Sequence, residues 1–245
     1  MTEPIQTLLF DFGGTLDGNG VAWKERFYAL YRAEGLDISA DDFQPSFFAA
    51  DSSLIGSLPS STDLAGTVNA LVARLEVELA SRSIDDTQSP MVDAANGKAR
   101  AARVAARFLA EASDAFTRNR PLLKELGKRY RLGVVSNFYG NLDAVCQGAG
   151  LASLFSTLVD SHRVGVEKPD PAIFRVALDA LAAAPETTVL IGDSLRRDGE
   201  GARRTGMRFI WLMSAGSRAP EASQAPQPLF RHAIAGLGDL MRILQ

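Results

Sequence analysis

The sequence predicts an α/β protein built around a parallel sheet, and two observations support this. Five short apolar, β-rich segments occur along the 245 residues, at 6–12, 131–137, 155–160, 188–193 and 208–213. Segments with helical periodicity lie between them. Strands that alternate with helices pair in parallel through crossover connections, so we expect a sheet with helices on both faces.

The individual elements have local signatures. The strand over 6–12 is an apolar run that stops at a glycine pair, as a buried strand does where it reaches a loop. Helices are expected over 122–130, 141–149 and 171–184. Pro171 stands in the first turn of the last one, where a helix tolerates proline.

Residues 18–114 interrupt this alternation, because they contain helical stripes and no convincing strand. Apolar residues recur at helical spacing from Leu64 to Leu79 and from Val104 to Ala115. We expect 18–114 to form a small helical bundle over the strand ends, with 1–17 and 115–245 forming the core. The low-complexity segment 214–228 is expected to be a mobile loop.

Composition narrows the class of protein. With 29 acidic and 26 basic residues the net charge is −3, which gives no electrostatic reason to expect a nucleic-acid partner. Cys146 is the single cysteine, so no internal disulfide is possible. The N-terminus lacks a basic region, and no apolar stretch approaches eighteen residues. We expect a cytoplasmic protein, monomeric or homodimeric, that binds a small molecule and no membrane.

Polar residues lie at the carboxyl ends of three of the predicted strands. Asp11 lies at the end of the first, Ser136 and Asn137 at the end of the second, and Asp193 at the end of the fourth. Ligands of open α/β sheets bind beyond the carboxyl ends of the strands, so these side chains are expected to converge.

The loops beyond these strands suit an anion and a divalent cation. Gly13 and Gly14 allow the backbone to approach an anion closely. Lys168 precedes a proline-stiffened turn, which restricts its ammonium group. Asp193 and Asp198 are five residues apart and suit a hard cation, for which Mg²⁺ is the expected ion.

Four motifs together resemble the haloacid dehalogenase-like (HAD) hydrolase superfamily over the whole chain. They are Asp-x-x-Gly-Thr-Leu from Asp11, Ser-Asn at 136–137, Lys-Pro-Asp-Pro-x-Ile-Phe from Lys168, and Gly-Asp-x-x-x-x-Asp ending at Asp198. Each motif alone is weak, but four in this order are specific. The resemblance implies a Rossmann-like core with strand order 5-4-1-2-3 and a helical cap, here 18–114, inserted after the first motif.

The resemblance also implies a reaction and its residues. It implies Mg²⁺-dependent hydrolysis of a small phosphorylated metabolite, with Asp11 as the nucleophile that forms an aspartyl-phosphate. Lys168 would steady the nucleophile and the phosphate, and Asp11, Asp193 and the carbonyl of Gly13 would hold the metal. Asp198 is either a supporting residue of this site or an acid in the first turn of a helix. The substrate phosphate would be bound by Gly14, Thr15, Ser136 and Asn137.

One position departs from the phosphatases of this superfamily. They carry a second Asp two residues after the nucleophile, as general acid and base, and this chain has Gly13 there. Loss of such a group typically costs about 10²- to 10⁴-fold in rate. The sequence therefore leaves open a slow enzyme, a substrate with a good leaving group, or a substitute acid such as Asp17, His162 or a residue of the cap.

Two other functions are compatible with Gly13. Superfamily dehalogenases also lack the second Asp, although they resemble one another in serine-rich sequence where this chain has Gly192 and Asp193. A catalytically poor binding or regulatory protein is the other alternative. Two groups of arginines, one on a helix of the inserted segment and one near the fourth motif, are expected to be solvated helix surface: Arg100, Arg103 and Arg107, and Arg196, Arg197, Arg203 and Arg204.

Overall fold

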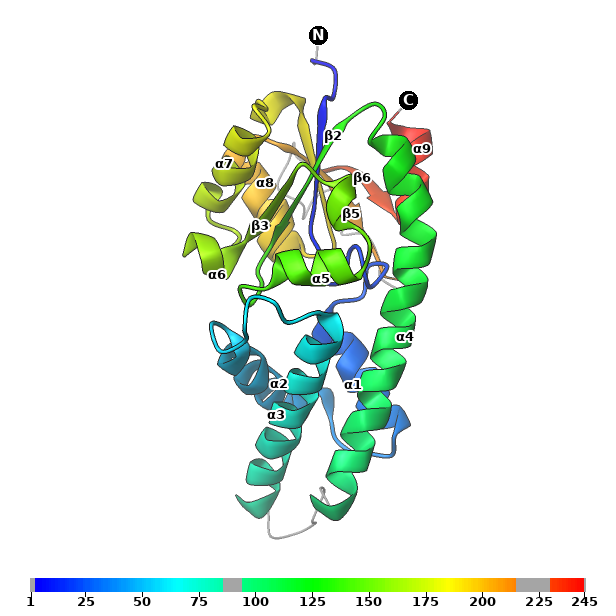
Figure 1. Cartoon of the computed structure of the whole chain (residues 1–245), viewed down its shortest axis with the longest axis vertical. Coiled ribbons are helices and arrows are strands. Elements are labelled where there is room, and N and C mark those ends of the chain that lie inside the picture. Colours follow the sequence, from blue (N-terminus) through cyan, green and yellow to red (C-terminus); the bar gives the residue numbers. More distant parts are fainter. Residues whose placement is uncertain (1–2, 86–93, 215–229, 245) are drawn as a thin grey trace.

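The protein contains a six-stranded sheet, in which each strand is parallel to its neighbours (Figure 1). The computed structural model describes residues 3–85, 94–214 and 230–244. The strand order is β3-β2-β1-β4-β5-β6. The strands are β1 (Thr7–Phe10), β2 (Arg131–Ser136), β3 (Thr157–Asp160), β4 (Thr188–Gly192), β5 (Arg208–Leu212) and β6 (Phe230–Ile234). The predicted α/β class is confirmed.

The order of the first five strands agrees with the expected 5-4-1-2-3, and β6 extends the sheet beyond β5. Strand β6 was not predicted from the sequence; it follows the low-complexity segment and pairs with β5 through an irregular register. The expectation of a mobile loop concerns residues that lie, apart from Ser214, outside the described part of the chain.

Four helices lie together beyond the carboxyl ends of the strands (Figure 1). These are α1 (Trp23–Ala33), α2 (Ala40–Leu54), α3 (Leu64–Asp85) and α4 (Ala94–Leu126), and we call them the helical layer. The helix α4 continues from this layer along the sheet, across residue 114, where the predicted division falls. The helix predicted over 122–130 is therefore the end of α4, followed by a turn.

Shorter helices accompany the sheet. They are α5 (Leu142–Gly148), α6 (Ser161–Val164), α7 (Pro171–Ala180), α8 (Glu200–Thr205) and α9 (Leu240–Ile243). Short turns of other helical types are η1 (Ala152–Leu154), η2 (Pro185–Thr187), η3 (Leu195–Gly199) and η4 (Leu237–Asp239). The start of α7 is set locally, because the Asp170 side chain accepts a hydrogen bond from Ala172 N at 2.8 Å and Pro171 fills the first turn.

Alternation along β1 divides the core between the two faces of the sheet. Leu8 and Phe10 belong to a cluster that includes buried residues of α4, α5 and α9. Leu9, between them, belongs to a second cluster, with α7 and α8. Successive side chains of a strand point to opposite faces, so the near-continuous apolar sequence of β1 is what a doubly covered sheet requires.

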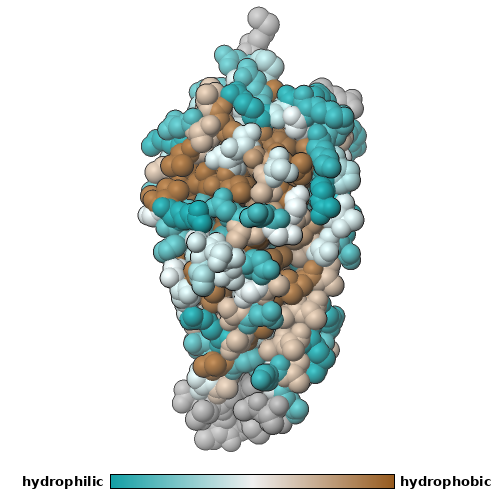
Figure 2. Space-filling view, viewed as in Figure 1, coloured by the Kyte–Doolittle hydropathy of each residue, from teal (hydrophilic) through white to brown (hydrophobic). Residues whose placement is uncertain are grey.

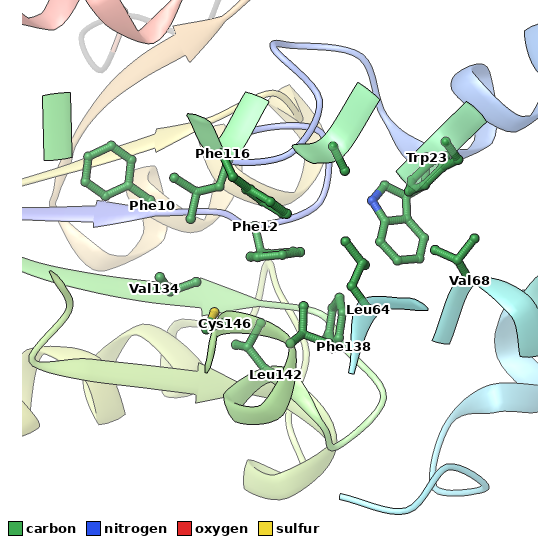
Figure 3. Close-up of a cluster of buried hydrophobic side chains, with 14 of the residues drawn as sticks. Phe10, Phe12, Trp23, Leu64, Val68, Phe116, Val134, Phe138, Leu142 and Cys146 are labelled. Carbon is green, nitrogen blue, oxygen red and sulfur yellow. The ribbon is translucent and has the colours of Figure 1, made fainter. Parts of the chain in front are cut away.

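The first of these clusters continues from the sheet into the helical layer (Figure 3). Phe12, just after β1, packs edge-on against Phe138, with ring centroids 5.5 Å apart. Trp23 of α1 in turn contacts Phe138 at 6.0 Å and Phe108 of α4 at 5.1 Å. Aromatic packing therefore fixes the helical layer against the loops that follow β1 and β2.

The surface mixes polar and apolar residues (Figure 2). On the face in that view, apolar residues gather mainly over the half that holds the sheet. Among the described residues, the large apolar side chains with the greatest exposure are scattered over several elements: Phe48, Ile55, Val77, Val176 and Leu195. None of the described helices is both long enough and apolar enough to cross a membrane.

Candidate active site

The ends of β1 and β2 and the loop before α7 bring three predicted residues into direct contact. Asp11 Oδ1 accepts a hydrogen bond from Ser136 Oγ at 3.0 Å and another from Lys168 Nζ at 2.6 Å. Lys168 Nζ also donates to Asp198 Oδ1 at 2.7 Å. All four side chains are buried. One ammonium group is therefore shared between two carboxylates at the carboxyl edge of the sheet.

Asn137 fixes the loop that carries this lysine. Its Oδ1 accepts from Lys168 N at 2.8 Å, and its Nδ2 donates to Lys168 O at 3.2 Å. Both amide atoms are thus engaged by the backbone of residue 168. Asn137, for which substrate binding is a prediction, has contacts that position Lys168.

Asp11 also belongs to a group of three carboxylates. Asp11, Asp193 and Asp198 each present an oxygen, and these oxygens lie within 4.8 Å of one another. Thr15 Oγ1 donates to Asp193 Oδ1 at 3.2 Å. Burial, together with the negative charges of Asp11 and Asp198, raises the pKa of Asp193 well above its ordinary value. An all-oxygen site with more negative than positive charge fits a hard divalent cation such as Mg²⁺.

Two glycines make this close approach possible. Gly14 has φ +89°, and a Cβ there would lie 2.6 Å from Asp193 Oδ2. A side chain on Gly192 would likewise collide with the carboxylate of Asp198. Glycine is therefore required at both positions for the acids to gather, which gives these motif glycines a steric purpose.

The charges around Asp11 favour its ionised form. Burial raises the pKa of Asp11, but the charge and hydrogen bond of Lys168 outweigh it, so the pKa lies below the ordinary value. Burial lowers the pKa of Lys168, but the charges and hydrogen bonds of Asp11 and Asp198 raise it by more, so the pKa lies above its ordinary value. A carboxylate nucleophile paired with an ammonium cation is the resulting state.

Asp198 is part of the site. Besides Lys168 it contacts the backbone of residue 194, whose N–H donates to its Oδ2 at 3.1 Å, and the side chain is fully buried. Asp198 lies in the first turn of η3 and also contacts Lys168, so the two possibilities that the sequence left open are compatible with each other. Burial, with the nearby charge of Asp11, raises its pKa, whereas Lys168 opposes this.

Asp17 lies apart from this group and is already satisfied. Its Oδ1 accepts from Gly14 N at 2.7 Å, and its Oδ2 accepts from Trp23 Nε1 at 2.7 Å and from Arg26 Nη1 at 3.0 Å. Burial raises its pKa, and Arg26 opposes that shift. Since both oxygens hold the loop and α1 in place, the contacts do not support Asp17 as a substitute acid.

Three residues near the site were not identified as functional from the sequence: Asp51, Tyr139 and Arg197. Tyr139, in the loop after β2, donates its hydroxyl proton to Asp51 Oδ1 of α2 at 2.5 Å. Arg197, treated as surface in the sequence analysis, is exposed but lies within electrostatic range of Asp11 and Asp51. Its position next to Asp198 was the available signal, whereas Asp51 depends on how α2 packs and has no motif.

The remaining candidates form ordinary contacts. Arg100 pairs with Glu76, and Arg103 and Arg107 both pair with Glu34, all within the helical layer. Arg203 and Arg204 pair with Glu200 on α8. The exposed His162 lies beside Gly56, which follows α2, and Gly140, which precedes α5. The exposed arginines agree with the expectation of a solvated helix surface: Arg103, Arg107, Arg203 and Arg204. For Arg100 that expectation was wrong, because its side chain is buried where it pairs with Glu76.

Comparisons with known proteins give one consistent family. Residues 5–206 match the family model of haloacid dehalogenase-like hydrolases. A phosphoserine phosphatase of Thermus thermophilus is 47% identical over 78 residues, which are 31% of this chain and 31% of that protein. The chain spans less than half the length of this and several other curated relatives.

Two further matches extend over most of the chain. A phosphoglycolate phosphatase of Rhodospirillum rubrum is 31% identical over 215 residues, covering 78% of this chain and 88% of that protein. The crystal structure of a 2-haloacid dehalogenase from Pseudomonas syringae has a TM-score of 0.53, is 24% identical and covers 98% of both chains. At that identity it shows the fold alone. The four motifs lie at the edge of one parallel sheet, and the family model matches most of the chain. The chain belongs to the haloacid dehalogenase-like hydrolase family.

Proposed function

We propose that this protein is a Mg²⁺-dependent phosphohydrolase that acts on a small phosphorylated metabolite through an aspartyl-phosphate on Asp11. The observation that carries the proposal is the position of the Asp11 carboxylate, held by Lys168 at 2.6 Å and by Ser136 at 3.0 Å beside two further acids. The phosphatase names of its relatives support the same reaction class.

The contacts suggest a division of labour. Lys168 and Ser136 both donate to Oδ1 of Asp11, and we assign Oδ2 as the oxygen that attacks phosphorus. Attack forms a bond between this oxygen and phosphorus and breaks the bond to the leaving oxygen. Lys168 offsets part of the repulsion between the carboxylate and the phosphate, and Ser136 is placed to donate to a phosphoryl oxygen.

The cation would be held by Asp11, Asp193 and the carbonyl of Gly13, with Asp198 in support. Mg²⁺ would supply charge neutralisation for a dianionic substrate next to carboxylates. Thr15 Oγ1 keeps Asp193 oriented through the hydrogen bond at 3.2 Å. Gly14 and Thr15 contribute the backbone that approaches the phosphate.

Gly13 restricts the substrate. Glycine at this position cannot give a proton to the leaving oxygen, so, unless another side chain supplies it, esters with stable leaving groups, such as acyl and aryl phosphates, are expected to react faster than alkyl phosphates. The helical layer, proposed as a cap over the site, would select the substrate and exclude water.

The test is phosphate release from acetyl phosphate and an aryl phosphate, with and without Mg²⁺. Release should require Mg²⁺ and disappear in Asp11→Asn, whereas Asp143→Asn, which changes a half-exposed acid of α5, should retain it. A panel of small phosphorylated metabolites then identifies the substrate.

The other functions predict different results. A dehalogenase would release chloride from 2-chloro acids without Mg²⁺, and the three gathered acids argue against such a metal-free site. A binding protein would take up beryllofluoride at Asp11 with no turnover of any compound. Either result would overturn the proposal.

A further inference from the structure

The departure of an alkoxide from phosphorus requires a proton, and the acids beside Asp11 are poorly placed to give one. Lys168 is held between Asp11 and Asp198 and is needed there as a cation. Asp17 has donors on both oxygens. Asp193 and Asp198 belong to the cation site. Any proton donor must therefore come from another element that faces the site.

Asp51 is an acid of the helical layer that contacts the loop after β2. It lies near the end of α2, where the chain reaches the carboxyl edge of the sheet (Figure 1). Tyr139, whose hydroxyl donates to Asp51 Oδ1, stands three residues after Ser136, in the loop that follows β2. The N–H of Gly56 donates to the carbonyl of Tyr139 at 3.4 Å, so a second contact holds the end of α2 against this loop.

The charges that face Asp51 come from the same site. Arg197 of η3 interacts electrostatically with Asp11, Asp193 and Asp198 of the candidate site and with Asp51 of α2. Burial raises the pKa of Asp51, and Glu167, next to Lys168, raises it as well, whereas Tyr139 and Arg197 lower it. The groups around Asp51 thus belong to the loops that carry the second, third and fourth motifs.

The two carboxylate oxygens of Asp51 differ in their surroundings. The hydroxyl of Tyr139 occupies Oδ1, and no hydrogen bond to Oδ2 occurs among the described residues. Oδ2 is therefore free to carry a proton for transfer, and the carboxylate left after that transfer would be stabilised by Tyr139 and by the charge of Arg197.

We propose that Asp51 is the general acid and base that Gly13 lacks, with Tyr139 as its positioning residue; this rests on the proposed phosphohydrolase function. As Asp11 attacks phosphorus and the ester bond breaks, the proton on Asp51 Oδ2 passes to the leaving oxygen and the alcohol departs. Water then attacks the phosphorus of the aspartyl-phosphate, its proton passes to Asp51, and phosphate and the Asp11 carboxylate are released. Protons and bonds balance over the two steps.

The test measures kcat for a series of phosphate esters whose leaving groups range from acetate and nitrophenol to simple alcohols. Asp51→Asn keeps an oxygen that accepts from Tyr139 but cannot supply the proton. We expect a loss of about 10²- to 10⁴-fold for alkyl phosphates and less than about tenfold for acetyl phosphate. Asp41→Asn, an exposed acid in the first turn of the same helix, is the matched control and should leave every rate unchanged.

Two further measurements separate a proton-donating role of Asp51 from a purely structural one. Tyr139→Phe should lower alkyl phosphate rates less than Asp51→Asn does, because the acid remains. An equal loss across all leaving groups in Asp51→Asn, or no loss, would overturn the proposal and leave Asp51 as a structural contact. If wild-type protein releases no phosphate from acetyl phosphate, or if Asp11→Asn releases it equally well, the proposed function fails first, so the two failures are distinguishable.

Discussion

The indole of Trp23 stands against Gly13, so that a Cβ added to residue 13 would lie 3.3 Å from Trp23 Nε1. That nitrogen already donates to Asp17 at 2.7 Å. The space for a side chain at residue 13 is small because Trp23 of α1 packs directly over it. Which residue fits at position 13 therefore depends on the side chains of the helical layer.

Restoring an acid at this position should damage the protein instead of improving it. Gly13→Asp would press on Trp23 and compete with Asp17 for its N–H, and overpacking of this kind typically costs about 1–3 kcal/mol of unfolding free energy. Urea denaturation measures the loss, and Gly13→Ala isolates its steric part. A Gly13→Asp variant with wild-type stability would show that α1 can move away from the loop.

Arg26 is expected to be essential for the stability of the link between β1 and α1. It pairs with Asp17 at 3.0 Å and donates to the carbonyl of Phe108 at 3.2 Å, in a buried position. Arg26→Met strands a buried carboxylate, so we expect a loss of about 3–5 kcal/mol in denaturant unfolding.

The double variant Asp17→Asn, Arg26→Met should lose less than Arg26→Met alone, because no charge is left without a partner. Arg118→Met, an exposed arginine of α4, is the control and should stay within about 0.5 kcal/mol of wild type. Equal losses in the single and double variants would contradict an electrostatic origin.

Mg²⁺ should stabilise the folded protein through the three gathered acids. A ligand that binds only the native state at 100 times its Kd adds about 2.7 kcal/mol, which raises the melting temperature measurably. Asp193→Asn should abolish most of this rise, whereas Asp179→Asn, an exposed acid of α7, should keep it. An identical rise in Asp193→Asn would place the ion elsewhere.

Cys146 should be unreactive until the protein unfolds. It is fully buried, and burial raises its pKa from 9.0 to about 12. Because the pKa of this thiol is higher in the folded than in the unfolded state, its contribution to folding stability is fully present at pH below about 9. That contribution is lost as the pH rises from about 9 toward 12. Thiol labelling at pH 8 should be slow in native protein and fast in denaturant; fast native labelling would contradict the buried position.

The sequence predicted those parts of the molecule that depend on local patterns. Short apolar runs located β1 to β5, and the motif spacing located Asp11, Lys168, Asp193 and Asp198, because strand ends and turns fix these residues locally. β6 was missed because its run of five residues stands beside a low-complexity segment and gains its stability from pairing with β5.

The positions of Asp51 and Tyr139 could not be predicted in this way. Their contact joins residues 88 apart in sequence and depends on how α2 is placed over the sheet. Asn137 shows the converse, since its place in a motif was recognised but its bonds to the Lys168 backbone depend on a loop 31 residues away. Motifs identify which residues gather, and tertiary packing decides which atoms they offer.

The continuity of α4 limits how this architecture can be modified. Near its start, Arg103 binds Glu34 of the helical layer, whereas near its end the Asn119 amide donates to Leu16 O and the Arg120 guanidinium donates to Ala149 O. The single helix α4, 33 residues and about 50 Å long, is thus shared between the helical layer and the part of the protein that holds the sheet. Replacing the helical layer with that of another protein would require exchanging the whole of α4, because a junction at residue 114 would interrupt the helix.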